Sequence, residues 1–334
     1  MKKNFAIIEE LKKRILVIDG AMGTNIKNYR LKEKDFRGEL LKSFSVNQKW
    51  NNDLLSITNP IIIRNIHKGF LEAGADIIET NTLNSNRFSQ GNYSLEGLVY
   101  KLNYYGAKIA RDLCDEFKLK DGKKRYVAGS VGPTNRIITL RTDIDNTIER
   151  NIDFQKLKEV YEEQISALID GGIDIVLIET VINSINAKAA IVAANEVYKR
   201  KNKVLPIMVS ATISNKSGKL LSGESLIDLE KVIKNENVIS IGINCSFGSK
   251  GLLPFIKELS KFEDLFISIY PNAGFPNKNG IYEESPIIMA RNIEEIIKSG
   301  CVNIVGGCCG TTFKHIEEIC KMSKKYKPRK ISSL

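Results

Sequence analysis

No stretch of this 334-residue sequence is apolar for long enough to cross a membrane, since none approaches the roughly 18 residues that a spanning helix needs. The N-terminus also lacks the uninterrupted apolar core of a secretion signal, because Glu9 and Glu10 break its apolar stretch. We therefore expect a cytoplasmic protein that makes no contact with a membrane.

Sequence fingerprints of nucleotide and nucleic-acid binding are absent as well. Neither the glycine-rich dinucleotide motif nor the phosphate loop of nucleoside triphosphatases occurs in the chain. Lys and Arg outnumber Asp and Glu by 50 to 39, giving a net charge of +11, but the basic residues are scattered. The densest basic runs, 120–125 and 324–330, do not form the aromatic-interleaved platform that binds single strands. We expect a solvated basic surface with a weak attraction for acidic partners and no nucleic-acid ligand.

What the chain does contain is a series of eight short apolar runs rich in β-branched residues. Continuous apolar runs, rather than strict alternation, are typical of strands buried on both faces of a parallel sheet. With 43% hydrophobic residues, the chain can also build a sizeable core. The runs are 14–20, 75–80, 125–132, 173–180, 205–212, 238–245, 265–272 and 302–309.

Helical patterns lie between these runs. The segment 59–74 places Pro60 at a helix start, four apolar residues on one face and Gly74 at the end, and the segment 285–300 repeats this scheme. Eight repeated strand–helix units predict a (β/α)8 TIM barrel that occupies residues 1–334 as a single domain. A doubly wound open sheet is the main alternative, which the missing phosphate loop disfavours. The long segment 21–58, with the only tryptophan, is expected to serve the active site.

The C-terminal ends of the strands of such a barrel converge on one mouth. This topology brings together three cysteines, Cys245 after the sixth predicted strand and Cys308 and Cys309 after the eighth. Three thiolates are a soft ligand set that selects zinc and leaves one tetrahedral position open for a substrate thiol. Because the spacing is not a C-x-x-C pattern, it fits tight packing of small residues around a turn equally well.

Three acidic residues also end predicted strands, namely Asp19, Glu79 and Glu179. Their carboxylates could accept hydrogen bonds from a substrate ammonium group; salt bridges or helix caps are the alternative roles. The remaining cysteines, Cys114, Cys301 and Cys320, are expected to be small buried apolar residues. His315 is considered as a fourth metal ligand and disfavoured, because its helix turn is expected to carry it away from the mouth.

Together the motifs resemble a known family. They are ILVIDGAMGT, DFRGE, NNDLL, EAGADIIETNT, GPTNR, LIET, GINC, PNAG and NIVGGCCGTT. In this order they are similar to the homocysteine S-methyltransferase family, and in particular to the N-terminal homocysteine-binding module of cobalamin-dependent methionine synthase. The resemblance covers about residues 13–330 of the chain, nearly all of it.

The resemblance implies a (β/α)8 barrel whose mouth holds Zn²⁺ through Cys245, Cys308 and Cys309. It also implies that Glu179 and Asp19 lie near the amino group of homocysteine, with backbone N–H groups around Gly20 near its carboxylate. In such enzymes the zinc-bound homocysteine thiolate attacks the methyl group of methylcobalamin, which comes ultimately from 5-methyltetrahydrofolate, and methionine is formed.

The sequence departs from the full-length enzymes of that type in one respect. It contains no D-x-H-x-x-G cobalamin motif, and residues 325–334 read as a linker-like tail. Corrinoid- and folate-binding functions are therefore expected on a separate module or protein, and the chain is either a stand-alone subunit or an excised fragment. Two other functions stay open. One is a stand-alone methyltransferase that uses S-methylmethionine or betaine; the other is a non-catalytic zinc- and thiol-binding scaffold for a corrinoid protein.

Overall fold

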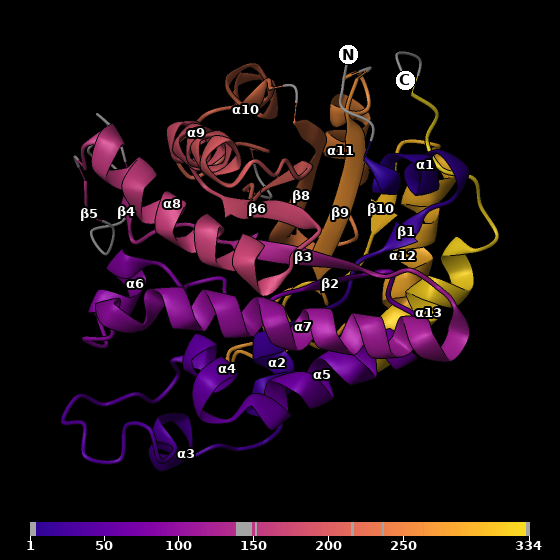
Figure 1. The fold of residues 1–334 in the computed structure, drawn as a ribbon. Helices are drawn as coiled ribbons and strands as arrows, with labels where there is room; N and C mark the ends of the chain where they lie inside the picture. Colours follow the sequence, from indigo (N-terminus) through magenta and orange to yellow (C-terminus); the bar gives the residue numbers. More distant parts are fainter. Residues whose placement is uncertain are drawn as a thin grey trace.

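The computed structural model describes residues 5–137, 149–150, 152–214, 217–235, 237–262 and 264–331. Within them, eight parallel strands form one sheet in the order β1-β10-β9-β8-β7-β6-β3-β2. A parallel bridge between Ile18 and Ile77 joins its two edges, so the sheet closes on itself (Figure 1). The strands are β1 (Leu16–Val17), β2 (Ile77–Glu79), β3 (Tyr126–Val131), β6 (Ile175–Val181), β7 (Ile207–Ala211), β8 (Val238–Gly248), β9 (Phe266–Asn272) and β10 (Ile304–Val305).

One main helix follows each of these strands and lies on the outside of the barrel (Figure 1). The predicted (β/α)8 barrel is therefore confirmed, and each of the eight apolar runs overlaps one of its strands. The helices are α5 (Pro60–Glu72), α7 (Val99–Asp121), α8 (Phe154–Gly171), α9 (Ser184–Lys201), α10 (Leu226–Ile233), α11 (Leu253–Leu259), α12 (Pro286–Lys298) and α13 (Phe313–Ser323).

Burial on both strand faces explains why the strands read as continuous apolar runs. In β1, Leu16 points into a core cluster inside the barrel, whereas Val17 belongs to the cluster between the strands and the helices. The interior cluster also contains Ile7 and Leu11 of helix α1 (Ala6–Lys13). Helix α1 therefore plugs the end at which the strands begin. We call that end the base and the opposite end the mouth.

Helices α5 and α12 begin and end at residues that favour helix boundaries. Helix α5 begins at Pro60, whose fixed φ suits a first helical position, although the Asn59 side chain makes no capping hydrogen bond. Helix α12 also begins at a proline, and there the side chain of Ser285 accepts a hydrogen bond from the backbone of Ile288. Gly74 and Gly300 follow the two helices with positive φ, as the sequence predicts.

The insertions gather on the connections that follow the first three strands. The segment 21–58 folds into α2 (Met22–Lys27), α3 (Glu33–Arg37), the 3-10 turn η1 (Asn52–Leu54) and α4 (Leu55–Thr58). After β2 come α6 (Arg87–Gly91) and the 3-10 turn η2 (Glu96–Leu98). After β3 lies a parallel pair that the sequence did not predict, β4 (Arg136–Ile137) with β5 (Glu149–Arg150).

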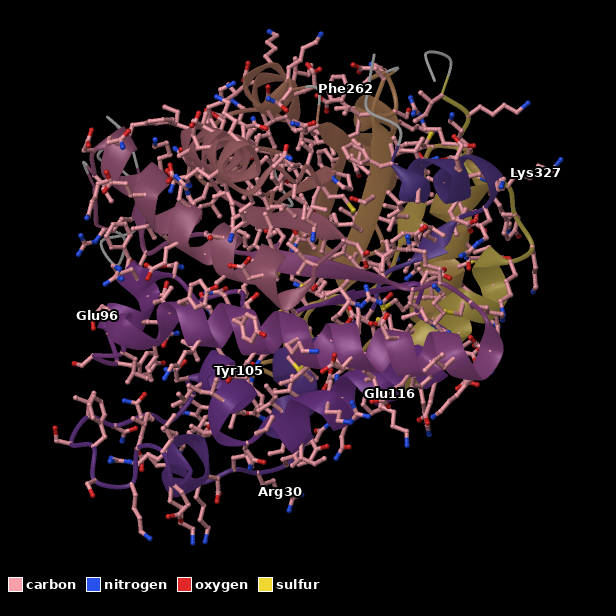
Figure 2. The ribbon with its side chains drawn as sticks, viewed as in Figure 1. Arg30, Glu96, Tyr105, Glu116, Phe262 and Lys327 are labelled. Atoms are coloured by element: carbon pink, nitrogen blue, oxygen red, sulfur yellow. The ribbon has the colours of Figure 1, made fainter. Side chains whose placement is uncertain are left out.

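Both ends of the described chain lie at the base, where Phe5 and Ile331 pack against the interior cluster. Arg329 is buried, and its guanidinium donates hydrogen bonds to the backbone carbonyls of Ser260, Phe262 and Leu265. The part of the tail before residue 332 is thus held against the barrel. Charged side chains such as Arg30 and Lys327 project outward around the ribbon (Figure 2).

None of the helices in the described ranges is long and apolar enough to span a membrane.

Candidate active site

A cavity of about 730 Å³ opens at the mouth of the barrel. Its wall combines the ends of several strands with the two segments 20–27 and 50–53 of the first long connection. This placement confirms that the enlarged first connection contributes to the mouth. The exposed side chain of Trp50 forms part of its wall.

Three thiols from two places in the sequence meet at this cavity. The sulfur atoms of Cys245, Cys308 and Cys309 all lie within 4.8 Å of one another, and Cys245 Sγ is 3.5 Å from Cys309 Sγ. All three side chains are half-buried. Among the residues that the structure describes, this is the one group of three or more His, Cys, Asp or Glu side chains close enough to hold a metal ion.

Backbone geometry aims each of these thiols at the cavity. Cys245 lies where the pairing of β8 with β9 shifts register, and it adopts a positive φ of 49°, which is uncommon outside glycine. The pair that follows β10 is fixed by two hydrogen bonds. The Cys308 N–H donates to the carbonyl of Pro271 (2.7 Å), and the Cys309 N–H donates to Asn272 Oδ1 (3.1 Å).

The chemistry of this donor set fits zinc. Hydrogen bonds from the thiols of Cys245 and Cys308 lower the pKa of Cys309, whereas hydrogen bonds with the other two thiols raise the pKa of Cys308. One sulfur of the cluster is therefore readily a thiolate, and a cation placed among the three sulfurs would stabilise all of them as thiolates. Three thiolates with a fourth side open to a cavity match a zinc site that binds substrate.

Beside the thiols lie the three carboxylates that end predicted strands. Asp19 and Glu179 are buried and Glu79 is half-buried, and all three line or adjoin the same cavity. Burial raises the pKa of each carboxyl group, and the charge of Glu179 raises the pKa values of Asp19 and Glu79 further. No Lys or Arg within the described ranges pairs with them, and Glu79 Oε1 has no hydrogen-bond partner. The site thus has acceptors for a cationic group that the described part of the chain does not supply.

Glu179 is held firmly between its neighbours. Its Oε1 accepts a hydrogen bond from Ser130 Oγ (2.5 Å), and its Oε2 accepts one from Asn244 Nδ2 (3.4 Å). Asn244 also binds the backbone N–H and the hydroxyl of Thr180, which has a positive φ of 54°. A β-branched residue in this conformation is strained, and such strain persists only where the surroundings fix it. Asn244 therefore couples the Glu179 carboxylate to the strand that carries Cys245.

Gly20 lies on the cavity wall, and its lack of a side chain is required. A Cβ atom there would approach Thr311 Oγ1 to 2.6 Å and the ring of Phe70 to 2.9 Å. Thr311 Oγ1 in turn accepts a hydrogen bond from the N–H of Ala21 (3.0 Å). Gly20 is therefore required by tight packing against Thr311 and Phe70, and the carboxylate-binding role predicted for it stays a prediction.

Sequence reasoning missed two residues of this cavity. Asp53, in the NNDLL motif, is buried, and its Oδ2 accepts hydrogen bonds from the N–H of Asn84 (2.8 Å) and from Ser85 Oγ (3.0 Å). Tyr282, in the segment that follows β9, reaches the thiol cluster. The motif could have drawn attention to Asp53. Nothing local in the sequence marks Tyr282.

The histidines serve other purposes. His315 lies in the first turn of α13, where its Nδ1 accepts a hydrogen bond from the N–H of Thr312 (3.1 Å) and its Nε2 binds the carbonyl of Glu284 (2.9 Å). Both ring nitrogens are engaged away from the sulfurs. His67 is fully buried in α5, and burial lowers its pKa to about 4.

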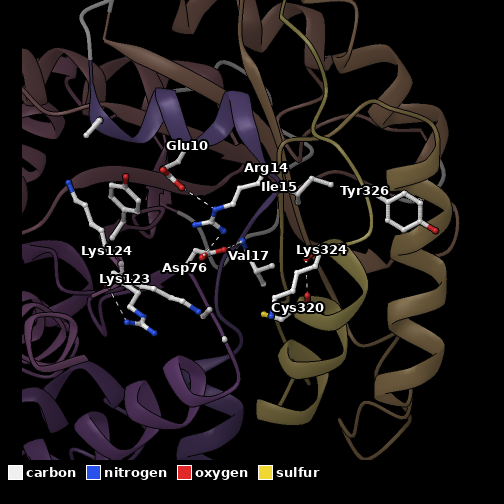
Figure 3. Close-up of a pocket in the computed structure, with 16 residues that line it drawn as sticks. Glu10, Arg14, Ile15, Val17, Asp76, Lys123, Lys124, Cys320, Lys324 and Tyr326 are labelled. Atoms are coloured by element: carbon white, nitrogen blue, oxygen red, sulfur yellow. Dashed lines mark hydrogen bonds and ion pairs between the residues drawn. The ribbon is translucent and has the colours of Figure 1, made fainter. Parts of the chain in front are cut away.

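A second cavity, of about 720 Å³, lies at the base (Figure 3). Arg14 and Asp76 lie in its middle, with Lys123 and Lys124 on one side and Lys324 on the other. Cys320 lines it as a single buried thiol. The ion pair between Arg14 and Asp76 (2.9 Å) compensates the charges at its centre.

Comparison with known proteins gives one family and one fold. A model of the homocysteine S-methyltransferase family matches residues 16–323. The metallated form of the homocysteine methyltransferase MmuM from Escherichia coli is similar in structure, with a TM-score of 0.71 at 21% identity, over 95% of this chain and 98% of that one. Its oxidised form gives a TM-score of 0.72 at 20% identity, over 94% and 97% of the two chains. The match therefore extends over nearly the whole barrel.

Proposed function

The chain belongs to the homocysteine S-methyltransferase family, and on that premise we propose that it is a zinc-dependent enzyme that methylates homocysteine with a methylcorrinoid donor. The donor, methylcobalamin in the simplest case, is carried by a separate module or protein and is recharged from 5-methyltetrahydrofolate. The observation that carries the proposal is the cluster of three thiols beside three carboxylates at one mouth, none of which pairs with a Lys or Arg of the described ranges.

Cys245, Cys308 and Cys309 would hold the zinc ion, which when bound would acidify the substrate thiol and keep it nucleophilic near neutral pH. The carboxylates supply the complementary recognition. Homocysteine carries an ammonium group, and Asp19 and Glu179 provide buried acceptors for it at the same cavity. Hydrogen bonds between an ammonium and carboxylates are among the stronger ones in proteins. An occupied site would also relieve the repulsion between these carboxylates.

Gly20 would complete this recognition at the same α-carbon, where backbone N–H groups near it would bind the substrate carboxylate. Both charged groups on the α-carbon of homocysteine would then be fixed, so its side chain could extend toward the thiol cluster. The substrate sulfur forms the new S–C bond with the methyl group. The bond between that methyl group and the corrinoid breaks, and its electron pair stays on the corrinoid. The substrate thiol proton is lost to solvent before the transfer.

Part of the cavity lining supports the choice of a corrinoid donor. Residues of the NNDLL and GPTNR motifs line it, including Asn51, Asn52, Thr134 and Asn135. These motifs resemble the methionine synthase branch of the family, and their neutral amides and hydroxyls suit a ligand rich in hydrogen-bonding groups. A small sulfonium or quaternary ammonium donor is the second candidate, because Trp50 and Tyr93 present aromatic rings at the same cavity and aromatic rings attract such cations.

A donor comparison tests the proposal. Zinc-loaded protein is incubated with homocysteine and methylcobalamin, S-methylmethionine or betaine, and methionine is measured together with the corrinoid spectrum. Homocysteine-dependent demethylation of methylcobalamin supports the proposal. Methionine formed only from S-methylmethionine or betaine contradicts the donor assignment.

The scaffold hypothesis has a test of its own. If the chain were a non-catalytic zinc-binding protein, X-ray absorption at the zinc edge would not change when homocysteine is added. The proposed function requires a fourth sulfur ligand to appear at the zinc.

A further inference from the structure

One side of the thiol cluster is covered by a small hairpin that joins β9 to α12. An antiparallel bridge pairs Pro276 with Tyr282, and the N–H of Asn277 donates to the carbonyl of Ile281 (2.8 Å). The hairpin tip is exposed, with Ile281 56% accessible. Tyr282, at the end of the hairpin, turns back toward the cavity and lies on its wall.

The stem of this hairpin is anchored by Glu284. Its Oε1 accepts hydrogen bonds from Asn292 Nδ2 (2.5 Å) and Ser249 Oγ (3.2 Å), and its carbonyl binds His315 Nε2 (2.9 Å). The backbone N–H of Glu284 also donates to the carbonyl of Ala273 (3.2 Å). These contacts come from the end of β8, from α12 and from α13, so the position of the hairpin is fixed by the barrel itself.

The Tyr282 side chain packs against Gly310, next to the cysteine pair. A Cβ atom added to Gly310 would lie 2.3 Å from Tyr282 Cβ and 2.4 Å from its Cγ, so the tyrosine occupies space that only a glycine leaves free. The phenol therefore lies beside Cys309 on the wall of the cavity, and it is one of the groups that lower the pKa of that thiol. Gly310 follows Cys309 immediately and has a positive φ of 84°. Glycine at position 310 therefore leaves room for the Tyr282 side chain beside Cys309.

We propose that Tyr282 is a positioning residue, whose hydroxyl donates a hydrogen bond to the Cys309 sulfur and fixes that sulfur as a ligand. This inference rests on the proposed function, because it assumes that the three thiols bind a metal ion. Partners that hydrogen-bond to metal ligands set the orientation and electron donation of those ligands, and removing one typically costs about 10–100-fold in metal affinity. Tyr282 would have this effect on Cys309 without itself being a metal ligand.

Tyr282→Phe tests the inference because it keeps the ring against Gly310 and removes only the hydroxyl. The full-length chain is stripped of metal and loaded with Co²⁺, whose sulfur-to-metal charge-transfer band reports on the thiolates. We expect this band to shift to longer wavelength in Tyr282→Phe, because a thiolate that loses a hydrogen bond gives up its electrons more easily. Competition with a chelator should show at least about tenfold weaker Co²⁺ binding.

Tyr93→Phe is the matched control, since Tyr93 lines the same cavity and is not among the hydrogen-bond partners of the thiols. It should leave both the band and the affinity unchanged. If wild-type protein shows the band and Tyr282→Phe leaves band and affinity unchanged, the role of Tyr282 is overturned and the metal site stands. If wild-type protein shows no cobalt–thiolate band, the proposed function fails together with this inference.

Discussion

The two cavities of the barrel have nearly the same volume, about 730 Å³ at the mouth and about 720 Å³ at the base, but very different chemistry. At the base, Arg14 binds Glu10 (3.0 Å) and Asp76 (2.9 Å), so these charges are compensated within the chain. Arg125, which also lines the base, binds Asp121 (2.6 Å). At the mouth, three carboxylates crowd together, and within the described part of the chain neither Lys27, which lines the same cavity, nor another Lys or Arg pairs with them.

Cavity volume therefore does not identify the binding site in this barrel, whereas polar groups that lack partners do. Buried polar groups are normally satisfied, and a protein that leaves them unsatisfied gives up stability. The mouth carries this cost in Glu79 Oε1, which has no hydrogen-bond partner, and in the strained backbone of Thr180 and Cys245. In barrels of this kind, residues at the base serve stability and residues at the mouth serve chemistry. Substitutions at the two ends test whether stability and chemistry are separated in this way.

The largest effect is expected from removing a mouth thiol. Cys308→Ala or Cys309→Ala should abolish zinc retention and lower methyl transfer by at least about 10³-fold, because two thiols do not make a zinc site. The circular dichroism spectrum should keep its helical shape, since the ligands lie beyond the strand ends. Cys320→Ala, at the base, is the matched control and should retain both zinc and activity. Unfolding of the mouth variants would argue that the cluster is structural.

Removing one mouth carboxylate should have the next largest effect. Glu179→Gln keeps the shape of the side chain but loses the charge; its one amide oxygen can still accept from Asn244, while its NH2 group can donate to the Ser130 hydroxyl. A hydrogen bond to a charged group contributes about 1.5–3 kcal/mol, so the KM for homocysteine should rise about 10–100-fold. Zinc content, measured by atomic absorption, should not change. An unchanged KM would show that the ammonium binds elsewhere.

Asp53 predicts a dependence of stability on pH. Burial raises the pKa of this carboxyl group to about 7 in the folded chain, against about 3.9 in an unfolded one. Between these values the unfolded state has lost the proton and the folded state keeps it, so folding stability falls as the pH rises from about 4 to 7. The side chain introduced by Asp53→Asn is neutral at every pH, and its amide oxygen can accept the same two hydrogen bonds.

The stability of Asp53→Asn relative to the wild type should therefore increase by about 2–3 kcal/mol between about pH 5 and pH 8. Urea denaturation at the two pH values, followed by tryptophan fluorescence or circular dichroism, measures this difference. A stability difference that is the same at both pH values would contradict the assignment of a buried, protonated Asp53.

The sequence predicted the parts of this molecule that depend on a repeating pattern. All eight strands were found because each is apolar on both faces, and Cys245, Cys308 and Cys309 were found because parallel strands bring their ends to one mouth. The strand lengths were not predictable. The run 302–309 contains a strand of only two residues, Ile304–Val305, although the N–H groups of Gly306 and Cys308 still donate to carbonyls of β9.

Features that depend on contacts between distant segments were missed for a physical reason. Tyr282 lies in a hairpin without periodicity, and its contact with Cys309 exists only because Glu284 and His315 fix the stem. Asp53 is marked by its motif, but its burial follows from the packing of the first connection against residues 84–85. Neither the position of Tyr282 nor the burial of Asp53 can be predicted from the residues next to it in the sequence.

The smallest effect is expected at the base, from Asp76→Ala. Asp76 Oδ2 accepts a hydrogen bond from the buried N–H of Val17 (2.9 Å), and Oδ1 binds the partly exposed Arg14. Because an exposed ion pair contributes little, most of the expected loss of about 1–2 kcal/mol in the free energy of unfolding comes from the unpaired N–H of Val17. Glu10→Ala removes only a surface partner of Arg14 and should cost less than about 0.5 kcal/mol. Neither variant should change the KM for homocysteine, since both residues lie at the end of the barrel opposite the thiols.

A rise in KM for Asp76→Ala would show that the two ends of the barrel are coupled. It would contradict the assignment of stability to the base and of chemistry to the mouth.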